Sequence, residues 1–364
     1  MVKVQYSHTF DAHMSTNLGE ESISNPRQAI KELVKNAYDA DAENVWITLS
    51  GPDAPDGRTG SLPSEITIDK ITVKDDGYAM TDEDIKGKYF RPGTDSRRKE
   101  TKSPIHKRRV VGEKGQGHIA TKRLGKVIKL TSNPLNYPGR QASHSMNKTI
   151  TFTLDWREFK DGLDFEAILS DGTIEEREIA QNHGVTLEIS ELVDHKWHYN
   201  NYHKLQLEMG MMLIPKELRR EGDNFTIWIA TPFSAGDFER IRQDTSGLNM
   251  ALFKLEAATK YDEAKDQTTV DYHIEKRTKS VGSDAGFVWD RQEHNGKHQN
   301  SYTIPGKGFG DVKFVLYWFP QGGSLASEQK NIIGRKQIHD FLIKFSGIKI
   351  FQDNIRIRPY GDPR

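Results

Sequence analysis

Three polar residues that could do chemistry lie on one stripe of a helix predicted over residues 26–41, PRQAIKELVKNAYDAD. At about 100° per residue, Glu32, Asn36 and Asp39 stack along one side, because positions i, i+4 and i+7 share a helix face. Four apolar side chains occupy the other side: Ile30, Leu33, Val34 and Ala37. The alternative interpretation is an ordinary amphipathic helix whose polar face is solvated. Asparagine and aspartate are weak helix formers, so this stripe would be unusual for such a face.

A second group of residues, DDGYAM over residues 75–80, directly follows a predicted strand. An ionised carboxylate accepts hydrogen bonds and donates none, so an aspartate here suits an exocyclic amine such as that of adenine. Gly77 would let the backbone approach a flat ring closely. Because DDG after a strand is also a common turn sequence, the motif alone leaves both interpretations open.

A third group, GEKGQG over residues 112–117, precedes a helix predicted from His118 to Leu124. Glycine-rich backbone before a helix N-terminus presents N–H groups and the positive end of the helix dipole, which suits phosphate. The spacing matches neither the Walker motif nor the dinucleotide fingerprint. For this group taken alone, a flexible loop is the alternative.

In this order and spacing, the three groups resemble the motifs of the GHKL ATPase superfamily, over roughly residues 20–190. That superfamily includes gyrase-type topoisomerases, large heat-shock chaperones, histidine kinases, MutL proteins and MORC proteins. The ending GIKIFQDNIRIRPYGD is most similar to prokaryotic MORC-like members. The resemblance implies an α+β fold: a two-layer α/β sandwich, the Bergerat ATP-binding fold, in residues 1–221, and a smaller α/β transducer-like domain in residues 222–364.

The resemblance also assigns roles to residues. Glu32 would be the general base that activates water, Asn36 would hold Mg²⁺, and Asp75 would recognise the adenine amine. The implied ATP contacts are Asn36, Asp39, Asp75, Gly77, Ala79, Met80, Gly93, Thr94, Gly112, Lys114, Gly115, Gln116, Gly117, His118 and Thr186. One carboxylate, one magnesium ligand and a glycine cradle are a sufficient set for phosphoryl transfer to water.

Two positions depart from the family pattern. Ala79 stands where the family has the second glycine of the adenine box, and Gly184-Val185-Thr186 stands where the family has Gly-Thr near the last strand. Thr186 is therefore the candidate for the nucleotide-contacting hydroxyl. In the second domain, Lys330 lies where the transducer lysine of the family contacts the γ-phosphate; a solvated loop lysine is the alternative. Four other basic residues are rivals for that role: Arg335, Lys336, Arg356 and Arg358.

Residues 93–117 as a whole are long and aperiodic, and by the resemblance they would form the mobile ATP lid. Loops of this length inside a domain are commonly functional. Eight basic side chains lie in this segment: Arg97, Arg98, Lys99, Lys102, Lys107, Arg108, Arg109 and Lys114. Three environments stay open for them: ATP phosphates, a DNA backbone or solvent alone.

Periodicity and turn residues predict the remaining elements. Asn25 and Pro26 suit the cap and the first position of the main helix, and Thr81 suits the cap of a short helix. Strands are expected at residues 45–49, 66–68, 71–73, 127–131, 149–154, 165–169 and 185–189, and helices near 194–213 and 332–345. The first domain is therefore expected to be a mixed sheet with helices on one face, and the second domain is expected to begin at FTIWIA.

Composition narrows the class of protein. The 364 residues include 52 basic and 52 acidic side chains, so the overall charge does not indicate bulk attraction to nucleic acid, and only a local patch stays open. There is no cysteine, which excludes disulfides and thiol chemistry. No apolar run approaches the roughly 18 residues of a membrane span. We expect a cytoplasmic protein without a membrane partner, and we expect the full-length chain to continue beyond Arg364.

The function that these observations favour is Mg²⁺-dependent hydrolysis of ATP. By the resemblance, the ATP-bound form would close its lid and form a homodimer, acting as a clamp or switch on a larger partner, DNA or protein. Two other classes stay open: a nucleotide-gated binding module with negligible turnover, and a phosphotransferase of the histidine-kinase type. The placement of Glu32 to activate water counts against the kinase.

Overall fold

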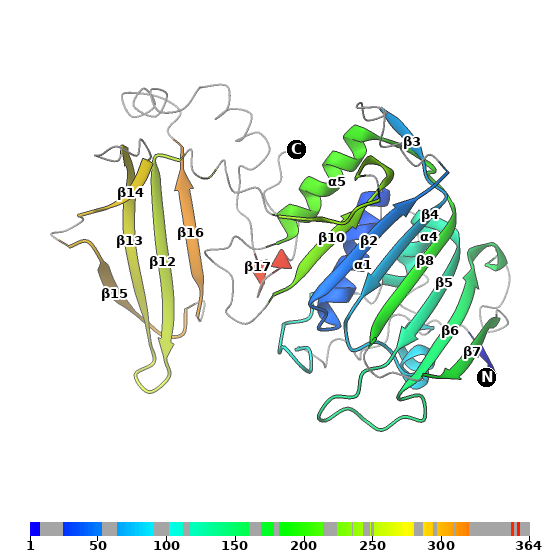
Figure 1. The fold of residues 1–364 in the computed structure, drawn as a ribbon. Coiled ribbons are helices and arrows are strands. Elements are labelled where there is room, and N and C mark those ends of the chain that lie inside the picture. Colours follow the sequence, from blue (N-terminus) through cyan, green and yellow to red (C-terminus); the bar gives the residue numbers. More distant parts are fainter. Residues whose placement is uncertain are drawn as a thin grey trace. The chain divides into compact units, whose positions relative to one another are not determined.

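The computed structural model describes residues 1–7, 25–52, 64–90, 102–111, 117–159, 169–177, 182–213, 224–234, 236–242, 248, 251–279, 287–293, 297–308, 311–319, 351–352 and 355–356. The chain divides into two compact units, each described here by itself (Figure 1). The first unit extends to Leu213 and also includes the described residues 224–242 and two short strands, β17 (Phe351–Gln352) and β18 (Ile355–Arg356).

A nine-stranded sheet forms the first unit, in the order β1-β7-β6-β5-β8-β4-β2-β10-β11 (Figure 1). Its strands are β1 (Val2–Ser7), β2 (Asn44–Ser50), β4 (Lys70–Asp75), β5 (Gly125–Asn133), β6 (Lys148–Asp155), β7 (Leu169–Glu176), β8 (Gly184–Leu192), β10 (Thr226–Ala230) and β11 (Glu239–Arg240). Neighbours are antiparallel except β2 and β10, which are parallel. The sheet is therefore mixed, as predicted. Two shorter strands, β3 (Glu65–Thr67) and β9 (Lys196–His198), pair with each other.

Three helices pack on one face of this sheet: α1 (Pro26–Asp39), α4 (Gly117–Leu124) and α5 (Tyr199–Met212). In β2, Val45, Ile47 and Leu49 are buried in the same core as the helices, whereas the residues between them are half-buried. This alternation arises because successive strand side chains point to opposite faces. The first unit is thus a two-layer α+β arrangement, and the predicted fold class is confirmed. None of the described helices is long and apolar enough to span a membrane.

The main helix, α1, begins as its sequence predicts. The Asn25 side chain accepts a hydrogen bond from Gln28 N at 3.0 Å, and Pro26 takes the first position, where no N–H donor is needed. At the other end, Asp41 adopts a left-handed backbone with φ of +59°. A residue in this conformation terminates a helix, so α1 stops at Asp39, two residues before the predicted end.

A short helix, α2 (Asp82–Asp84), follows the DDGYAM segment. The Thr81 hydroxyl accepts from Asp84 N at 3.1 Å, and the Asp84 carboxylate accepts from Thr81 N at 3.1 Å. This reciprocal pair is a capping box, so the predicted cap at Thr81 is confirmed. The chain continues as a π-helical turn over Ile85–Tyr89.

The strand β10 lies elsewhere than the sequence suggested. It is the FTIWIA stretch that was expected to open the second domain, yet it pairs with β2 from Thr226 opposite Asn44 to Ala230 opposite Thr48. The polar stretch before β10 suggested a domain boundary. The pairing of β10 with β2, about 180 residues earlier in the chain, leaves no signal in the sequence around either strand. Of the strand predicted at residues 165–169, only Leu169 lies among the described residues, and it is the first residue of β7.

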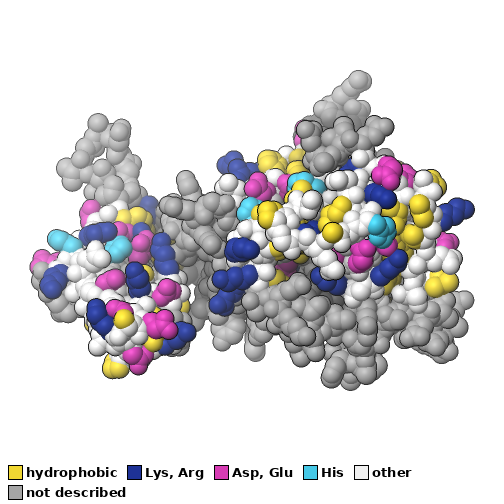
Figure 2. Space-filling view, turned by 90° about the horizontal axis from the view of Figure 1, so that it is seen from below, with side chains coloured by type: hydrophobic (Ala, Val, Ile, Leu, Met, Phe, Trp, Pro, Cys, Tyr) yellow, Lys and Arg dark blue, Asp and Glu magenta, His cyan; other side chains and the backbone are white. Residues whose placement is uncertain are grey.

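The described part of the second unit is an antiparallel sheet in the order β14-β13-β12-β16, with β15 also paired to β13. Its strands are β12 (Phe253–Asp262), β13 (Gln267–Lys279), β14 (Phe287–Gln292), β15 (Asn300–Pro305) and β16 (Lys313–Trp318). Basic and acidic side chains alternate over the face of this unit seen in Figure 2. The helix predicted at residues 332–345 lies outside the described residues, so the α/β character of this unit stays a prediction.

Candidate nucleotide site

Glu32 lies on the polar stripe of α1 and is held at one of its two oxygens. Gln28 Nε2 and Lys35 Nζ both donate to Glu32 Oε1, at 3.2 and 2.7 Å. Oε2 accepts no hydrogen bond from any residue that the structure describes. A fixed carboxylate with one open oxygen is what a general base needs. The pairing with Lys35 was missed in the sequence, although the i, i+3 spacing could have indicated it.

Asn36 lies half-buried one turn after Glu32 on the same stripe. Within the described part of the chain, its side-chain amide makes no hydrogen bond. An amide oxygen is a hard ligand that suits Mg²⁺, which in nucleotide sites binds through one or two protein groups, phosphates and water. The residues present therefore fit a magnesium ion that arrives with a nucleotide, and Asn36 would hold it.

Asp75, the last residue of β4, is buried and has two oxygens in different surroundings. Its Oδ1 accepts from the backbone N–H groups of Gly77, at 2.9 Å, and Val185, at 3.3 Å. Its Oδ2 accepts no hydrogen bond from the described residues. Burial raises the pKa of Asp75 from its ordinary value of 3.8 to about 6, although the two N–H donors lower it. A buried carboxylate with one open acceptor suits a flat amine-bearing ring.

The neighbouring Asp76 has a structural role instead. Its Oδ1 accepts from the N–H groups of Glu43 and Asn44, both at 2.8 Å, and its Oδ2 accepts from the Asn44 side chain at 2.9 Å. These bonds fasten the end of β4 to the start of β2. Of the two adjacent aspartates, Asp75 is the one with an open oxygen, in agreement with the assignment from the family motif.

The DDGYAM segment packs directly on the end of α1. Tyr78 N donates to Ala40 O at 2.9 Å, and a Cβ on Gly77 would lie 2.5 Å from that same oxygen. Gly184 is constrained in the same way, because its φ is +118° and a Cβ there would lie 1.9 Å from Asp75 O. Glycine is therefore required at both positions, since a side chain would push α1 and β8 away from the carboxylate.

Ala79 keeps the backbone shape of the glycine that the family has at this position. Its φ is +55°, in the left-handed region that alanine rarely adopts. The next residue, Met80, is fixed from β5: Ser132 Oγ accepts from Met80 N at 2.9 Å and donates to Met80 O at 2.7 Å. Ser132 is a supporting residue that no sequence motif indicated.

Thr186 lies on the other face of the sheet from Asp75. The register of β4 and β8 places Thr186 opposite Lys74, which is exposed, whereas Asp75 is the next residue along β4 and is buried. Side chains of successive strand residues point to opposite faces. The register therefore argues against Thr186 as the nucleotide hydroxyl, and Val185 contributes its backbone N–H to Asp75 instead.

The described part of the predicted lid, residues 102–111, is bound to the end of α1. The Asp41 carboxylate accepts from the Ser103 hydroxyl and from the N–H groups of Ile105, at 2.7 Å, and His106, at 3.1 Å. These bonds hold the segment at one place on α1. The role of residues 93–117 as a mobile lid stays a prediction.

Asp39 connects α1 to the approach of the glycine-rich group. Its buried carboxylate accepts from Val111 N at 2.8 Å, and Val111 directly precedes residues 112–117. Gly117 then opens α4, which packs against α1. The DDGYAM segment and Val111, the residue just before the glycine-rich group, therefore both bind at the C-terminal end of α1.

One basic residue of the predicted lid is buried. Arg108, with an exposed fraction of 1%, donates through Nη1 to the carbonyl oxygens of Tyr38, at 3.2 Å, and Ala42, at 2.6 Å. Its guanidinium lies 4.5 Å from the centroid of the Tyr38 ring and 5.6 Å from that of Phe225. Of the three environments considered for the basic residues, none applies to Arg108, because it closes the carbonyl end of α1.

Several predicted site residues lie outside the described residues: Gly93, Thr94, Gly112, Lys114, Gly115, Gln116 and Lys330. Gly117 and His118 are described only as the first two positions of α4. The roles assigned to these residues stay predictions.

The family of the domain that carries this site comes from comparison with known proteins. Residues 23–165 match the family model of the histidine kinase-, DNA gyrase B-, and HSP90-like ATPases. This segment contains α1, the DDGYAM segment and α4. The resemblance to the GHKL superfamily is therefore confirmed for residues 23–165, which form a GHKL-type, ATP-binding domain.

Two further comparisons are more distant. A protein of Herpetosiphon aurantiacus described as "Putative type II restriction enzyme HgiDII" is 29% identical over 127 residues, covering 35% of this chain and 18% of the relative. The match thus spans less than a fifth of that relative's length. A solved structure, "Crystal Structure of N terminal domain of a DNA repair protein", is 14% identical and covers 73% of this chain and 71% of its own, with a TM-score of 0.34. That score is too low to support an argument.

Proposed function

We propose that this protein binds ATP with Mg²⁺ and hydrolyses it. The observation that carries the proposal is the buried Asp75, with one oxygen fixed and one open, on a segment that packs against the end of α1. Asp75 would accept a hydrogen bond from the adenine amine, and the stripe of Glu32 and Asn36 would face the phosphates. The GHKL type of residues 23–165 supports the same assignment.

In this proposal, Glu32 is the general base. Its open Oε2 accepts a proton from the water that attacks the γ-phosphate, while Gln28 and Lys35 hold Oε1. Asn36 holds the magnesium ion, which when bound neutralises charge on the phosphates. Residues 112–117 bind the phosphates through backbone N–H groups next to the start of α4.

We further propose that ATP binding closes the segment 93–117 and stabilises a homodimer, which acts as a clamp or switch on a larger partner. The bonds between residues 102–111 and α1 support this, because the nucleotide and the segment would then share one helix. Lys330 would add a cation at the γ-phosphate.

The description of HgiDII favours DNA as the partner. Because the chain has 52 basic and 52 acidic residues, binding of DNA would rest on a local basic patch. Filter binding of duplex DNA with and without a non-hydrolysable ATP analogue tests this choice.

The proposed reaction is tested by Glu32→Gln. A positioned general base contributes about 10²–10⁴-fold, so phosphate release should fall at least 100-fold while ATP affinity stays within about twofold. Phosphate release and equilibrium binding of ATP measure the two effects. Glu263→Gln is the matched control, because Glu263 is exposed in a turn of the second unit, and it should leave both unchanged.

The same assay separates the alternatives. Turnover that is equal in the wild type and Glu32→Gln would remove Glu32 from the mechanism. Tight ATP binding without phosphate release in the wild type would favour the nucleotide-gated binding module. Transfer of the labelled γ-phosphate to the protein would identify a phosphotransferase of the histidine-kinase type.

A further inference from the structure

One arginine, Arg140, is hydrogen-bonded to the DDGYAM segment and to α2. Arg140 follows β5, and its side chain is 5% exposed. Its Nη1 donates to Tyr78 O at 2.7 Å and to Leu135 O at 2.6 Å. Its Nη2 donates to Ala79 O at 2.8 Å and to Asp84 Oδ2 at 3.0 Å. The planar fork of arginine can serve four oxygens in this way, whereas a lysine ammonium cannot.

Two aromatic rings enclose the same guanidinium. It lies 5.5 Å from the centroid of the Tyr78 ring and 5.3 Å from that of Tyr137, and the two rings are 5.6 Å apart. Leu135 N also donates to Tyr78 O at 3.0 Å. The peptide between Tyr78 and Ala79 is therefore held by the segment after β5 through both hydrogen bonds and ring contacts.

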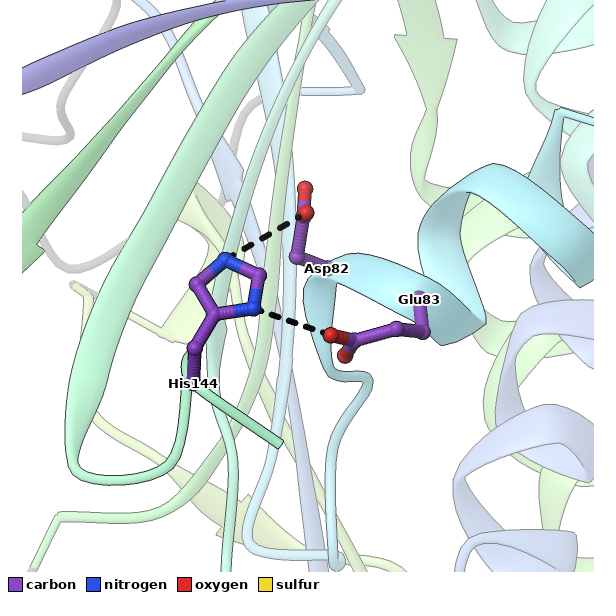
Figure 3. A group of neighbouring side chains, drawn as sticks. All are labelled: Asp82, Glu83 and His144. Atoms are coloured by element: carbon purple, nitrogen blue, oxygen red, sulfur yellow. Dashed lines mark hydrogen bonds and ion pairs between the residues drawn. The ribbon is translucent and has the colours of Figure 1, made fainter. Parts of the chain in front are cut away.

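The later part of that segment is fastened to the start of α2. His144 lies between two carboxylates, with Nδ1 3.0 Å from Glu83 Oε1 and Nε2 3.6 Å from Asp82 Oδ2 (Figure 3). Lys86 Nζ and Tyr6 OH already occupy the two oxygens of Asp82, at 2.8 and 2.9 Å. This group is accordingly a cluster of polar contacts between the segment after β5 and the start of α2. It keeps the segment that carries Arg140 in register with the DDGYAM segment.

Ala79 is the residue that needs such support. Its φ of +55° is unfavourable for any residue with a Cβ, and glycine would adopt it freely. Arg140 holds the carbonyl groups on both sides of the Ala79 Cα, Tyr78 O and Ala79 O. Two residues earlier in the chain, Gly77 N donates to Asp75 Oδ1. The position of the adenine-facing carboxylate thus depends on a backbone that the arginine holds in shape.

We propose that Arg140 is a positioning residue for adenine recognition, resting on the proposed function of the site. It acts on Asp75 through the backbone of Tyr78 and Ala79. Its hydrogen bonds stabilise the left-handed conformation at position 79, which a glycine would adopt without such support. Because none of its contacts with the described residues is to Glu32, Asn36 or α4, we expect its effect to be confined to the binding of the base.

The first test replaces the fork by an unbranched apolar chain. Arg140→Met should raise the KM for ATP and its dissociation constant at least tenfold, change kcat at saturating ATP by less than about threefold, and weaken the preference for ATP over GTP. Arg140→Lys keeps the positive charge near Asp84 but loses the planar fork, so its ATP affinity should lie between those of the wild type and Arg140→Met. Arg157→Met is the control, because Arg157 is an exposed arginine paired with Asp155 and Glu191 in the same unit.

The decisive test is rescue by glycine. If Arg140 acts by holding Ala79 in its left-handed conformation, Ala79→Gly should remove most of the need for it. The loss of ATP affinity on Arg140→Met should then shrink from at least tenfold to less than about threefold in the Ala79→Gly background. If the role of Arg140 were merely structural, Arg140→Met would lower the ATP affinity by the same factor in both backgrounds.

The outcomes distinguish this inference from the proposed function. Arg140→Met with unchanged ATP affinity, or with an equal loss in the Ala79→Gly background, overturns the inference while ATP hydrolysis by the wild type stands. A wild type and an Arg157→Met variant that bind no adenine nucleotide overturn the proposed function, and the inference with it. If Arg140→Met does not fold, as judged by circular dichroism, the same comparison is made with Arg140→Lys.

Discussion

Asp75 combines a structural task with a recognition task in one carboxylate. Its Oδ1 already accepts two backbone N–H groups, so a proton that binds to Asp75 will reside on Oδ2. Protonation turns the open acceptor into a donor that faces the adenine amine, and two donors cannot bond to each other. The state of one proton therefore decides whether the pocket suits adenine.

ATP affinity should fall as the pH decreases below about 6, the value to which burial raises the pKa of Asp75. The limit is about tenfold per pH unit, because only the ionised form binds the base. Titration calorimetry between about pH 7.5 and about pH 5 measures this for the wild type and for Asp75→Asn. The variant should bind ATP at least tenfold more weakly at the higher pH and should lack the pH dependence. Equal slopes in the two proteins would exclude Asp75 as the titrating group.

The stability of the nucleotide-free protein should respond to pH in the opposite direction. The folded protein binds this proton more tightly than the unfolded chain does, because the pKa rises from 3.8 to about 6 on burial. The stabilising contribution of Asp75 is therefore fully present below 3.8 and is lost as the pH rises through about 6. The loss is on the order of 3 kcal/mol.

Urea denaturation of the wild type and of Asp75→Asn, at about pH 4 and about pH 7, measures this difference. At the higher pH, the variant should be the more stable protein in spite of its weaker ATP binding. A variant that is less stable than the wild type at the higher pH would contradict the assigned cause, which is the burial of a charged group.

At the scale of elements, the end of α1 and the segment 102–111 form one structural unit. Asp41 binds the turn at residues 103–106, and Arg108 returns from that turn to the carbonyl groups of Tyr38 and Ala42. The last carbonyl groups of a helix have no partner within the helix, and here a segment about 70 residues later in the chain donates to one of them, Tyr38 O. The segment is therefore part of the helix terminus, in addition to any role as a lid.

Replacement of Arg108 by methionine should destabilise the protein by about 2–4 kcal/mol, because Ala42 O loses the donor that Arg108 supplies and the contacts of the guanidinium with the Tyr38 and Phe225 rings are lost, whereas Tyr38 O keeps its bond from Asp41 N. The midpoint of urea denaturation checks this. Lys102→Ala serves as the control, since Lys102 is an exposed basic residue of the same segment, and its effect should stay within about 0.5 kcal/mol. Similar midpoints for the two variants would show that the buried contacts of Arg108 contribute little.

Much of the fold and part of the candidate site were predictable, because they rest on short-range patterns. The apolar period of α1, the caps at Asn25 and Thr81, and the alternation in β2 are all encoded within a few residues. The pairing of β10 with β2, and the face on which Thr186 lies, depend on strand register, which no local pattern sets.

The supporting residues of the site were unpredictable for the same reason. Arg108, Ser132 and Arg140 act on backbone groups about 50 to 70 residues away in the chain. A polar side chain in a loop carries no sequence signal that distinguishes such a contact from exposure to solvent. The motifs predicted the residues that would touch the nucleotide, whereas the structure was needed to find the residues that hold them.

For the whole molecule, we expect ATP to control assembly. The protein should be a monomer or loose dimer without nucleotide and a tighter dimer with Mg²⁺ and a non-hydrolysable ATP analogue, because lid closure in this superfamily is coupled to a two-fold interface. Light scattering measures the mass in both states.

Lys330→Ala should prevent the change in mass while ATP affinity is kept, and Lys336→Ala is the control. An unchanged mass in both states would favour a simple binding module, and equal behaviour of the two lysine variants would end the assignment of Lys330.

The last turn of α1 restricts which changes in this stretch can be tolerated. Glu32, Asn36 and Asp39 share one helix face, and the carboxylates of Asp39 and Asp41 bind the segment 102–111 at the end of the helix. Each inserted or deleted residue rotates everything beyond it by about 100°. A single insertion between Asn36 and Asp39 would therefore turn the anchor away from the loop while leaving every side chain present. We therefore expect the length of this stretch to be constrained in addition to its residues.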